Sequence, residues 1–203
     1  HLHAHCDVLV IGGGVAGLAA AEAAAATGAR VIIADENPMF GGLADISGGT
    51  IGDASQLDWV AGKTAALAEA ENVHVLTRTT AVGHWHHNYV MLFERLADHD
   101  PALLAAGTPR QRLWKVRAHQ VILATGAIER PIAFANNDRP GVMLASAARA
   151  MVERKLVEAW GDTAGQDVLA VGYATPFVGP LTGAARRVVR LRDGRIADVP
   201  SAA

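Results

Sequence analysis

Two patterns of apolar positions alternate over the first 36 residues. The runs Asp7–Ile11 and Arg30–Ala34 are short, rich in Val and Ile, and flanked by glycine or charged residues, which is typical of buried strands. Between them, Val15–Thr27 is an Ala-rich segment of helical length, and Gly28 is suited to end a helix there. The pattern therefore predicts a strand, a helix and a second strand, the repeating unit of a parallel sheet.

The next segment continues this alternation. A helix is predicted over Gln56–Ala70, with Ser55 as its N-cap. Leu57, Val60 and Leu67 are expected on the apolar face of this helix. The short run Val73–Leu76 then supplies the third parallel strand.

The remainder of the chain predicts a β-meander, a fourth parallel strand and a less regular C-terminal third. The meander strands are Thr79–Trp85, Asn88–Leu96 and Gln111–Arg117, with a polar loop at 98–109, and the parallel strand is His119–Gly126. Beyond them we expect a helix over Val142–Val157, a strand near Asp167–Val171 and a hairpin over Arg187–Ile196. The fold class is thus α/β, a Rossmann-like parallel sheet with flanking helices and an inserted β-meander. We expect residues 1–130 to form the dinucleotide-binding domain, and residues 131–203 a linker helix and the truncated or divergent start of a second domain.

A glycine pattern marks the turn between the first strand and its helix. Gly12, Gly14 and Gly17 follow the G-x-G-x-x-G spacing directly after the strand. In this arrangement the first glycine permits the tight turn, the second lets a pyrophosphate approach the backbone, and the third lets the helix pack against the strand. The helix N-terminus then faces the phosphates with free amide groups and a positive dipole end. The motif predicts a dinucleotide site.

An acidic pair ends the second predicted strand. Asp35 follows the strand directly and is placed to accept hydrogen bonds from a ribose, whereas Glu36 is its exposed neighbour. A carboxylate there repels a 2′-phosphate. Arg30 sits at the opposite end of the strand, so no arginine is adjacent in sequence to reverse that preference. We therefore expect NAD to bind better than NADP.

Composition narrows the choice of function. The formal net charge is −2 and the basic residues are scattered, so neither nucleic acid nor an anionic membrane surface is indicated as a partner. Cys6 is the single cysteine, which excludes an internal disulfide and a C-x-x-C pair and suits a reducing, cytoplasmic setting. The longest apolar stretch, 8–21, is too short and too glycine-rich to span a bilayer.

Histidines in the predicted meander and at the N-terminus raise the question of a metal. His84, His86 and His87 fit no common zinc spacing, and we interpret them as exposed meander residues. His1, His3 and His5 are expected in a mobile terminal segment. No metal site is predicted, and no residue is assigned as catalytic.

Several longer segments resemble a known family. They are Ala4–Val10, Thr77–Thr80, Asn88–Val90, Gly107–Trp114, Leu123–Pro131 and Phe134–Ala145. The order of elements resembles the flavoprotein superfamily with two dinucleotide folds that is related to glutathione reductase. Over residues 4 to 155 the sequence is similar to the α subunits of heterotetrameric sarcosine oxidases.

This resemblance implies a multi-subunit enzyme that oxidatively demethylates sarcosine to glycine, with α, β, γ and δ subunits. It implies a noncovalent NAD in this domain, flavins largely in the β subunit and at its interface with α, and folate chemistry elsewhere in the α subunit. It further implies that the backbone near Val82 meets the adenine. The chain alone is expected to be inactive.

The complete expected cofactor-binding set gathers the glycine loop, the acidic pair, a second Gly-Gly pair, the adenine position and the small-residue turn after the fourth parallel strand. It comprises Gly12, Gly14, Val15, Ala16, Gly17, Asp35, Glu36, Gly41, Gly42, Val82, Ala124, Thr125 and Gly126. Two alternatives remain. One is a free-standing FAD-dependent amine or NAD(P)H oxidoreductase with FAD in the same groove, and the other is a non-catalytic, degenerate fragment.

Overall fold

The computed structural model describes residues 1–131, 133, 137–138, 142–144, 146–147 and 150, together with the backbone of 169–172, 187–192 and 195–198. The chain divides into two compact units, His1–Gly126 and Ala127–Ala203. The division predicted from sequence, after residue 130, stays a prediction.

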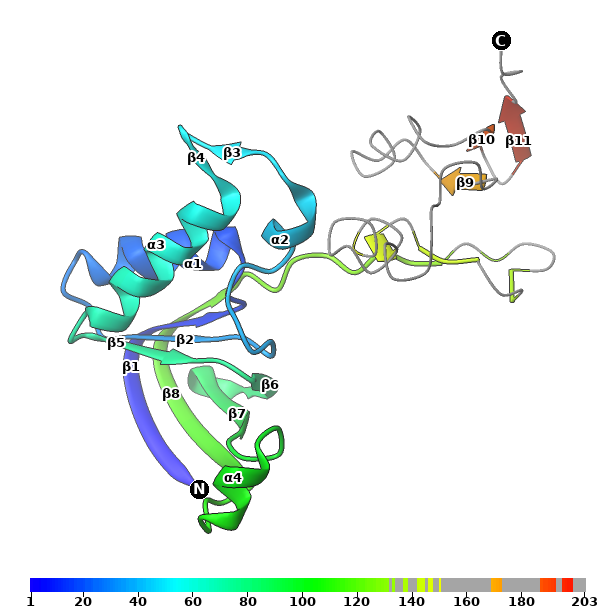
Figure 1. Ribbon diagram of the computed structural model, residues 1–203. Coiled ribbons are helices and arrows are strands. Elements are labelled where there is room, and N and C mark those ends of the chain that lie inside the picture. The colour runs from blue at the N-terminus through cyan, green and yellow to red at the C-terminus, as the bar shows by residue number, and fades with distance from the viewer. Residues whose placement is uncertain are drawn as a thin grey trace. The chain divides into compact units, whose positions relative to one another are not determined.

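The first unit is built on one mixed sheet of six strands in the order β5-β2-β1-β8-β7-β6 (Figure 1). Its strands are β1 Leu2–Ile11, β2 Val31–Ala34, β5 Val73–Leu76, β6 Thr79–Trp85, β7 Tyr89–Arg95 and β8 Gln111–Leu123. Strands β5, β2, β1 and β8 are parallel, whereas β7 runs antiparallel to β8 and β6 antiparallel to β7. The predicted Rossmann-like sheet and its β-meander are therefore confirmed.

Strand β8 differs from the expected arrangement. The sequence predicted two strands, Gln111–Arg117 and His119–Gly126, but one continuous strand Gln111–Leu123 serves both purposes. Its first half pairs antiparallel with β7, and the segment Trp114–Leu123 pairs parallel with β1. The expectation of a loose N-terminal segment is also wrong, because Leu2–Cys6 extends β1 along β8.

The helices of this unit are α1 Val15–Ala25, α2 Ala44–Ser47, α3 Gln56–Glu69 and α4 Pro101–Ala105. The hydroxyl of Ser55 accepts a hydrogen bond from the Asp58 amide, which confirms the predicted N-cap of α3. Val60 and Leu67 are buried as expected, but Leu57 in the first turn is 56% exposed. Between β2 and α3 lie α2 and the small hairpin of β3 Thr50–Ile51 and β4 Ala54–Ser55.

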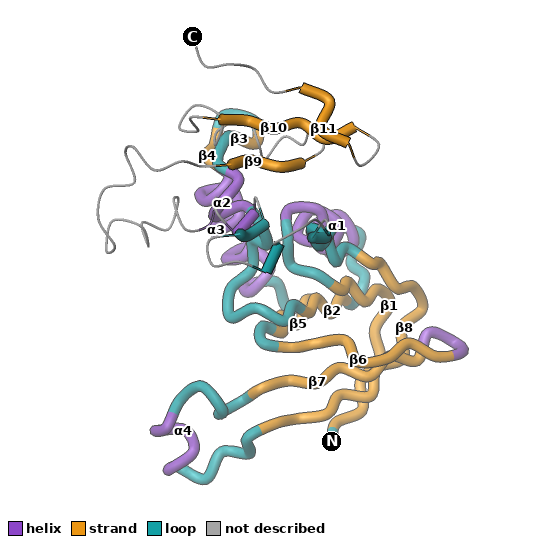
Figure 2. Tube along the Cα trace, turned by 90° about the vertical axis from the view of Figure 1, so that its right-hand side faces the viewer, coloured by secondary structure: helices purple, strands orange, loops and turns teal. Residues whose placement is uncertain are grey.

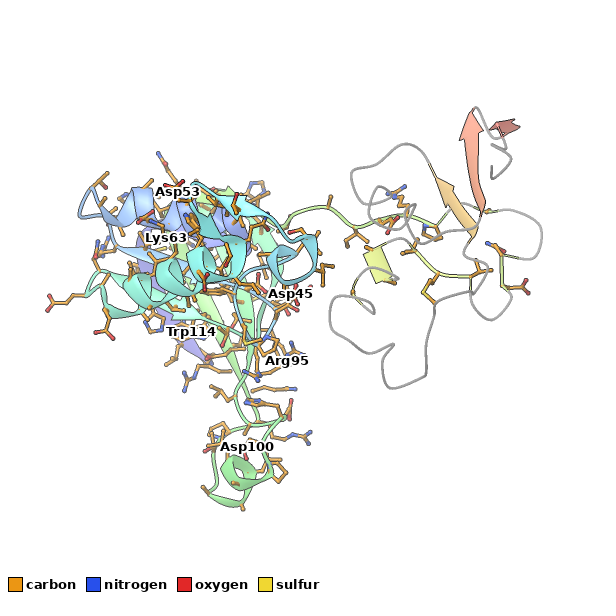
Figure 3. All side chains as sticks on the ribbon, turned by 45° about the horizontal axis from the view of Figure 1, so that its top comes forward. Asp45, Asp53, Lys63, Arg95, Asp100 and Trp114 are labelled. Carbon is orange, nitrogen blue, oxygen red and sulfur yellow. The ribbon has the colours of Figure 1, made fainter. Side chains whose placement is uncertain are left out.

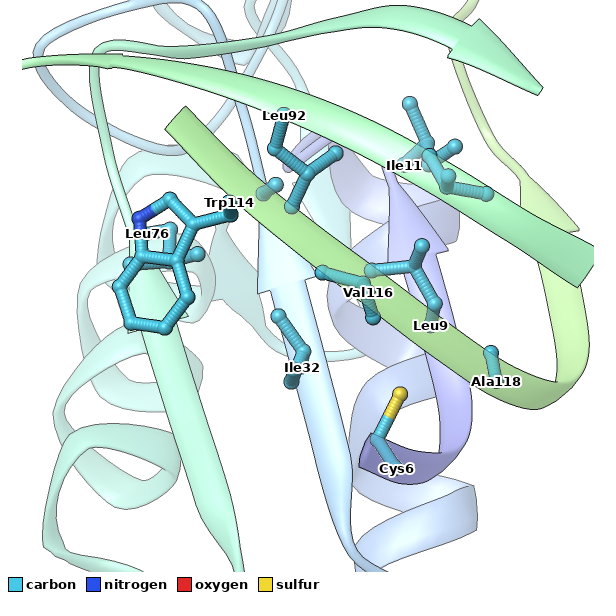
Figure 4. Close-up of a cluster of buried hydrophobic side chains, with 11 residues drawn as sticks. Cys6, Leu9, Ile11, Ile32, Leu76, Leu92, Trp114, Val116 and Ala118 are labelled. Carbon is cyan, nitrogen blue, oxygen red and sulfur yellow. The ribbon is translucent and has the colours of Figure 1, made fainter. Parts of the chain in front are cut away.

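Two apolar cores lie on opposite faces of the parallel strands, because alternate strand residues point to opposite sides. Val10, Val31 and Ile33 face a core shared with α1 and α3, whose ribbons lie together in Figures 1 and 2. Leu9 and Ile32 face the second core, which includes residues of β7 and β8 (Figure 4). The meander thus covers the face that the helices leave free.

The second unit contains three described strands, β9 Leu169–Gly172, β10 Arg187–Arg192 and β11 Arg195–Asp198. β10 pairs parallel with β9 and antiparallel with β11, in agreement with the predicted hairpin. Most of the helix expected over 142–157 lies outside the described residues. In the described part of the chain, no helix is long and apolar enough to cross a membrane.

Candidate functional site

The glycine loop begins where β1 ends. The Gly12 amide donates to the Ala34 carbonyl at 2.8 Å, and the Ala124 amide donates to the Ile11 carbonyl at 2.8 Å. Gly12 has φ +108°, and a Cβ at this position would overlap the carbonyl of Ala124. Both observations require glycine. The loop is therefore fixed by the ends of two neighbouring strands.

Gly17 brings the helix onto the loop. A Cβ on Gly17 would overlap the carbonyl oxygen of Gly12 and would lie 3.4 Å from the Cβ of Ala124. Its role is thus the close helix–strand packing predicted from the sequence, since no larger residue fits there.

Gly14 differs from the other two. It is the N-cap of α1 with φ −72° and ψ −177°, a conformation open to any residue, and a Cβ there would meet nothing nearer than the Cα of Gly42 at 4.0 Å. No side chain caps the helix, and its first turn holds no acidic residue. The space above Gly14 and the amides of Val15, Ala16 and Gly17 suit an anionic group.

A Gly-Gly pair, Gly41 and Gly42, lies alongside the glycine loop. The Gly41 amide donates to the Gly13 carbonyl at 2.8 Å, and Gly14 and Gly41 form an isolated parallel bridge. A Cβ on Gly42 would come within 3.2 Å of the Gly14 Cα. The structure therefore brings together two glycine segments that are far apart in sequence.

Asp35 is tied into the same loop. Its carboxylate accepts hydrogen bonds from the Gly13 amide at 2.6 Å and from the Asn37 amide and side chain at 2.8 and 2.9 Å. The residue is only 9% exposed. An ionised carboxylate has about four acceptor positions, so about one is left for a ribose hydroxyl. The sequence predicted the ribose role but missed that Asp35 holds the glycine loop, a contact between residues 22 positions apart.

An arginine lies close to the acidic pair, contrary to the sequence-based expectation. The guanidinium of Arg95, at the end of β7, donates to the Glu36 carbonyl at 2.6 Å. Figure 3 shows Arg95 between the body of the unit and the α4 loop marked by Asp100. Glu36 has an exposed side chain, as expected. No sequence signal marks Arg95, because 59 residues separate it from its acceptor.

The predicted adenine position, Val82, lies on the edge strand β6. The Thr79 amide donates to the Asp35 carbonyl at 2.7 Å, so β6 starts beside Asp35. The pairing of β6 with β7 shifts register between Ala81 and Gly83, which leaves Val82 in a bulge and 53% exposed. Its backbone groups are therefore suited to meet a ligand, and the adenine role stays a prediction.

The last predicted segment, Ala124–Gly126, leaves β8 at the same sheet edge. Ala124 lies against Gly12 and Gly17, while Thr125 and Gly126 are exposed and Gly126 has φ +71°. Gly12, Asp35 and Ala124 thus all meet at the carboxyl end of the parallel strands, where ligands bind in open α/β sheets.

The histidines of the meander are not gathered. His86–Asn88 forms a 3₁₀ turn, so His86 does not lie on the same strand as His84. Among the described residues, no group of three potential ligands could hold a metal ion.

The parallel sheet, the glycine-rich turn and the inserted meander define the dinucleotide-binding domain of an FAD-linked oxidoreductase. The profile of the family described as FAD dependent oxidoreductase matches residues 7–122. The chain belongs to this family. It is also similar to sarcosine oxidase α subunits. The family supports a flavin cofactor.

Two of the similar proteins are α subunits from bacteria. The sarcosine oxidase α subunit of Corynebacterium sp. (strain P-1) is 43% identical over 96% of this chain and 20% of its own length. That of Rhizobium meliloti (strain 1021) is 45% identical over 74% of the chain and 15% of its own length. The similarity thus reaches beyond residues 4–155. The chain spans about a fifth or less of the length of these relatives.

A solved structure supports the fold. The structure of L-proline dehydrogenase from P. horikoshii is similar to this one, with a TM-score of 0.64 and 24% sequence identity. The match covers 98% of this chain and 39% of the dehydrogenase chain. At this identity the likeness concerns the fold alone.

Proposed function

We propose that this chain binds the ADP half of a dinucleotide, as the nucleotide-binding portion of a sarcosine-oxidase-type α subunit. The observation that carries the proposal is the open space at Gly14. No protein atom requires glycine there, whereas a pyrophosphate crossing to the uncapped start of α1 would require it. The ribose would be held by Asp35, and the adenine would lie against the backbone near Val82.

We further propose that NAD is the dinucleotide. The similarity of the sequence to sarcosine oxidase α subunits supports NAD, while the FAD-dependent family to which the chain belongs supports FAD as the alternative. Both contain the ADP half, so the groove alone suits either one. The test is to denature the purified protein, separate the released small molecules and identify them by mass spectrometry. NAD alone supports the proposal, FAD alone replaces it, and a protein with neither must then be titrated with both.

For the whole protein we propose oxidative demethylation of sarcosine to glycine, in an assembly with β, γ and δ subunits in the cytoplasm. The support is the similarity to sarcosine oxidase α subunits and the single cysteine of this chain, Cys6, which suits a reducing compartment. This chain alone should give no hydrogen peroxide from sarcosine, because the described residues offer no catalytic group. Steady peroxide formation by the single chain would contradict this assignment of roles.

The competing proposal is a degenerate fragment that binds nothing. A thermal melt with and without NAD or FAD separates the two, since a ligand that binds only the folded state raises the melting temperature. An unchanged melting temperature at millimolar ligand would favour the degenerate fragment.

A further inference from the structure

A basic depression lies on the first unit, away from the dinucleotide groove. It has a volume of about 250 Å³ and is lined by residues of β1, of β8, of the segment before β2 and of the turn between β6 and β7. The lining side chains that carry chemistry are His5, Cys6, Arg30, His87, Arg117 and His119.

The depression is separate from the dinucleotide groove. His5 pairs with Arg117 across β1 and β8, whereas the glycine loop begins after Ile11. Six to seven residues of strand lie between them, which at about 3.3 Å per residue is roughly 20 Å. A dinucleotide pyrophosphate at Gly14 therefore does not account for this gathering of basic residues.

One of its two guanidinium groups is held rigidly. Asp7 accepts hydrogen bonds from the Arg30 backbone amide at 2.9 Å, from its Nε at 3.0 Å and from its Nη2 at 2.9 Å. These bonds hold the pKa of Asp7 well below its usual range, so Asp7 remains a carboxylate. Arginine has five N–H donors, and two side-chain donors are used, which leaves about three for a ligand.

The second guanidinium group is also supported. The Arg117 guanidinium carbon lies 5.4 Å from the centre of the Tyr89 ring, a cation–π distance. Two oriented guanidinium groups match the oxygens of a phosphate-type anion, because their planar forks donate paired hydrogen bonds.

The charge balance favours an anion. Asp7 offsets one of the two arginines, and Nδ1 of His119 lies 3.7 Å from its carboxylate. Burial, followed by the nearby Asp7 charge, raises the pKa of the Cys6 thiol to about 11, so the thiol adds no negative charge near neutral pH. His5, His87 and His119 add imidazole ring nitrogens to the lining, and an imidazole N–H can donate a hydrogen bond to an anion.

We propose that this depression binds a doubly charged oxyanion of the phosphate type. Such a group could come from free phosphate or from a phosphorylated small molecule. The site needs neither the dinucleotide nor a partner subunit.

Sulfate is a suitable probe, because it is a doubly charged oxyanion at neutral pH. The 203-residue chain is titrated with sulfate, with chloride at matched ionic strength as the control, and the imidazole C–H resonances are followed by NMR. We expect saturable shifts of the His5, His87 and His119 signals. The exposed His99, outside the depression, should not move.

Removing one positive charge near the anion is expected to change affinity about fivefold. Arg117→Gln should therefore weaken sulfate binding by about that factor, and Arg117→Lys by less. Arg110→Gln is the matched control, because it changes the net charge by the same amount. Arg110 lies outside the depression, where it pairs with Asp98.

If chloride shifts the histidine signals as much as sulfate does, or if the His99 signal shifts as much as those of the depression, the effect is ionic screening and the proposal is overturned. Sulfate binding that is weakened equally by Arg110→Gln and Arg117→Gln would also overturn it. If binding is confirmed, a second titration with inorganic phosphate and with a phosphate monoester identifies the source, because preference for the monoester indicates contacts beyond the oxyanion.

Discussion

The three glycines of the fingerprint have different roles, and substitution can separate them. A side chain at Gly17 would overlap the Gly12 carbonyl, a backbone atom that cannot move without disturbing β1. A side chain at Gly14 enters open space and meets only the Gly42 Cα at 4.0 Å. Gly17→Ala should therefore damage folding, whereas Gly14→Val should damage binding.

The expected magnitudes follow from these contacts. Overpacking against backbone costs about 3 kcal/mol, so Gly17→Ala should lower Tm by roughly 10 °C. Gly14→Val loses a favourable N-cap residue, which costs about 1 kcal/mol and roughly 4 °C. Its isopropyl group would occupy the path of the pyrophosphate, so NAD affinity should fall at least about 100-fold, or about 2.7 kcal/mol.

Calorimetric titration and thermal melting of the same preparations provide the two readouts. Gly62→Ala is the matched control, because Gly62 lies on α3 and a Cβ added there would meet no atom within 4 Å. It should keep full NAD affinity and melt slightly higher, since alanine favours helix over glycine. NAD binding by Gly14→Val at the unsubstituted affinity would refute the proposed path of the pyrophosphate. An unchanged Tm in Gly17→Ala would refute the packing role.

Three further outcomes are expected. Asp35→Ala should weaken the binding of NAD by about 1.5–3 kcal/mol and reduce the difference in affinity between NAD and NADP. Arg95→Ala should increase that difference, because it removes a cation near the acidic pair. Calorimetric titration of both variants with both cofactors checks this. Ser55→Ala should lower the free energy of unfolding by about 1 kcal/mol in urea, and Ser55→Asp should not. Asp7 has a lowered pKa in the folded state, so its stabilising effect is present above about pH 4 and disappears as pH falls. The Tm difference between the parent and Asp7→Asn should therefore shrink on acidification, and a difference that grows would contradict the linkage.

The elements around the candidate site were predictable because their signals are local. Gly12 and Gly17 lie next to the apolar runs that they join, and Ser55 directly precedes the helix that it caps. Two strands divided at Ala118 were predicted, yet one strand continues there because its backbone pairs with β1. Strand pairing depends on backbone groups, which a hydrophobic pattern does not report.

Other features depend on contacts between distant segments. Asp35 is predicted as a ribose ligand from its place after a strand, but its bond to the Gly13 amide exists only once β1 and β2 are side by side. Arg95 reaches Glu36 only in the folded chain, because 59 residues of sequence separate the two. The basic depression likewise requires β1 and β8 to be paired, since the sequence separates His5 from Arg117.

The unbroken strand β8 also governs how this unit can open. Its residues bond to the meander at one end and to the first parallel strand at the other, so neither part can separate without exposing the strand that both share. Local opening in proteins follows such contiguous cooperative units. Backbone amides of β7 and of β1 should accordingly exchange with solvent in a single subglobal event. The proposed adenine end and phosphate end of the site would then fold and unfold together, and a nucleotide bound at one end would protect the amides at the other end from exchange.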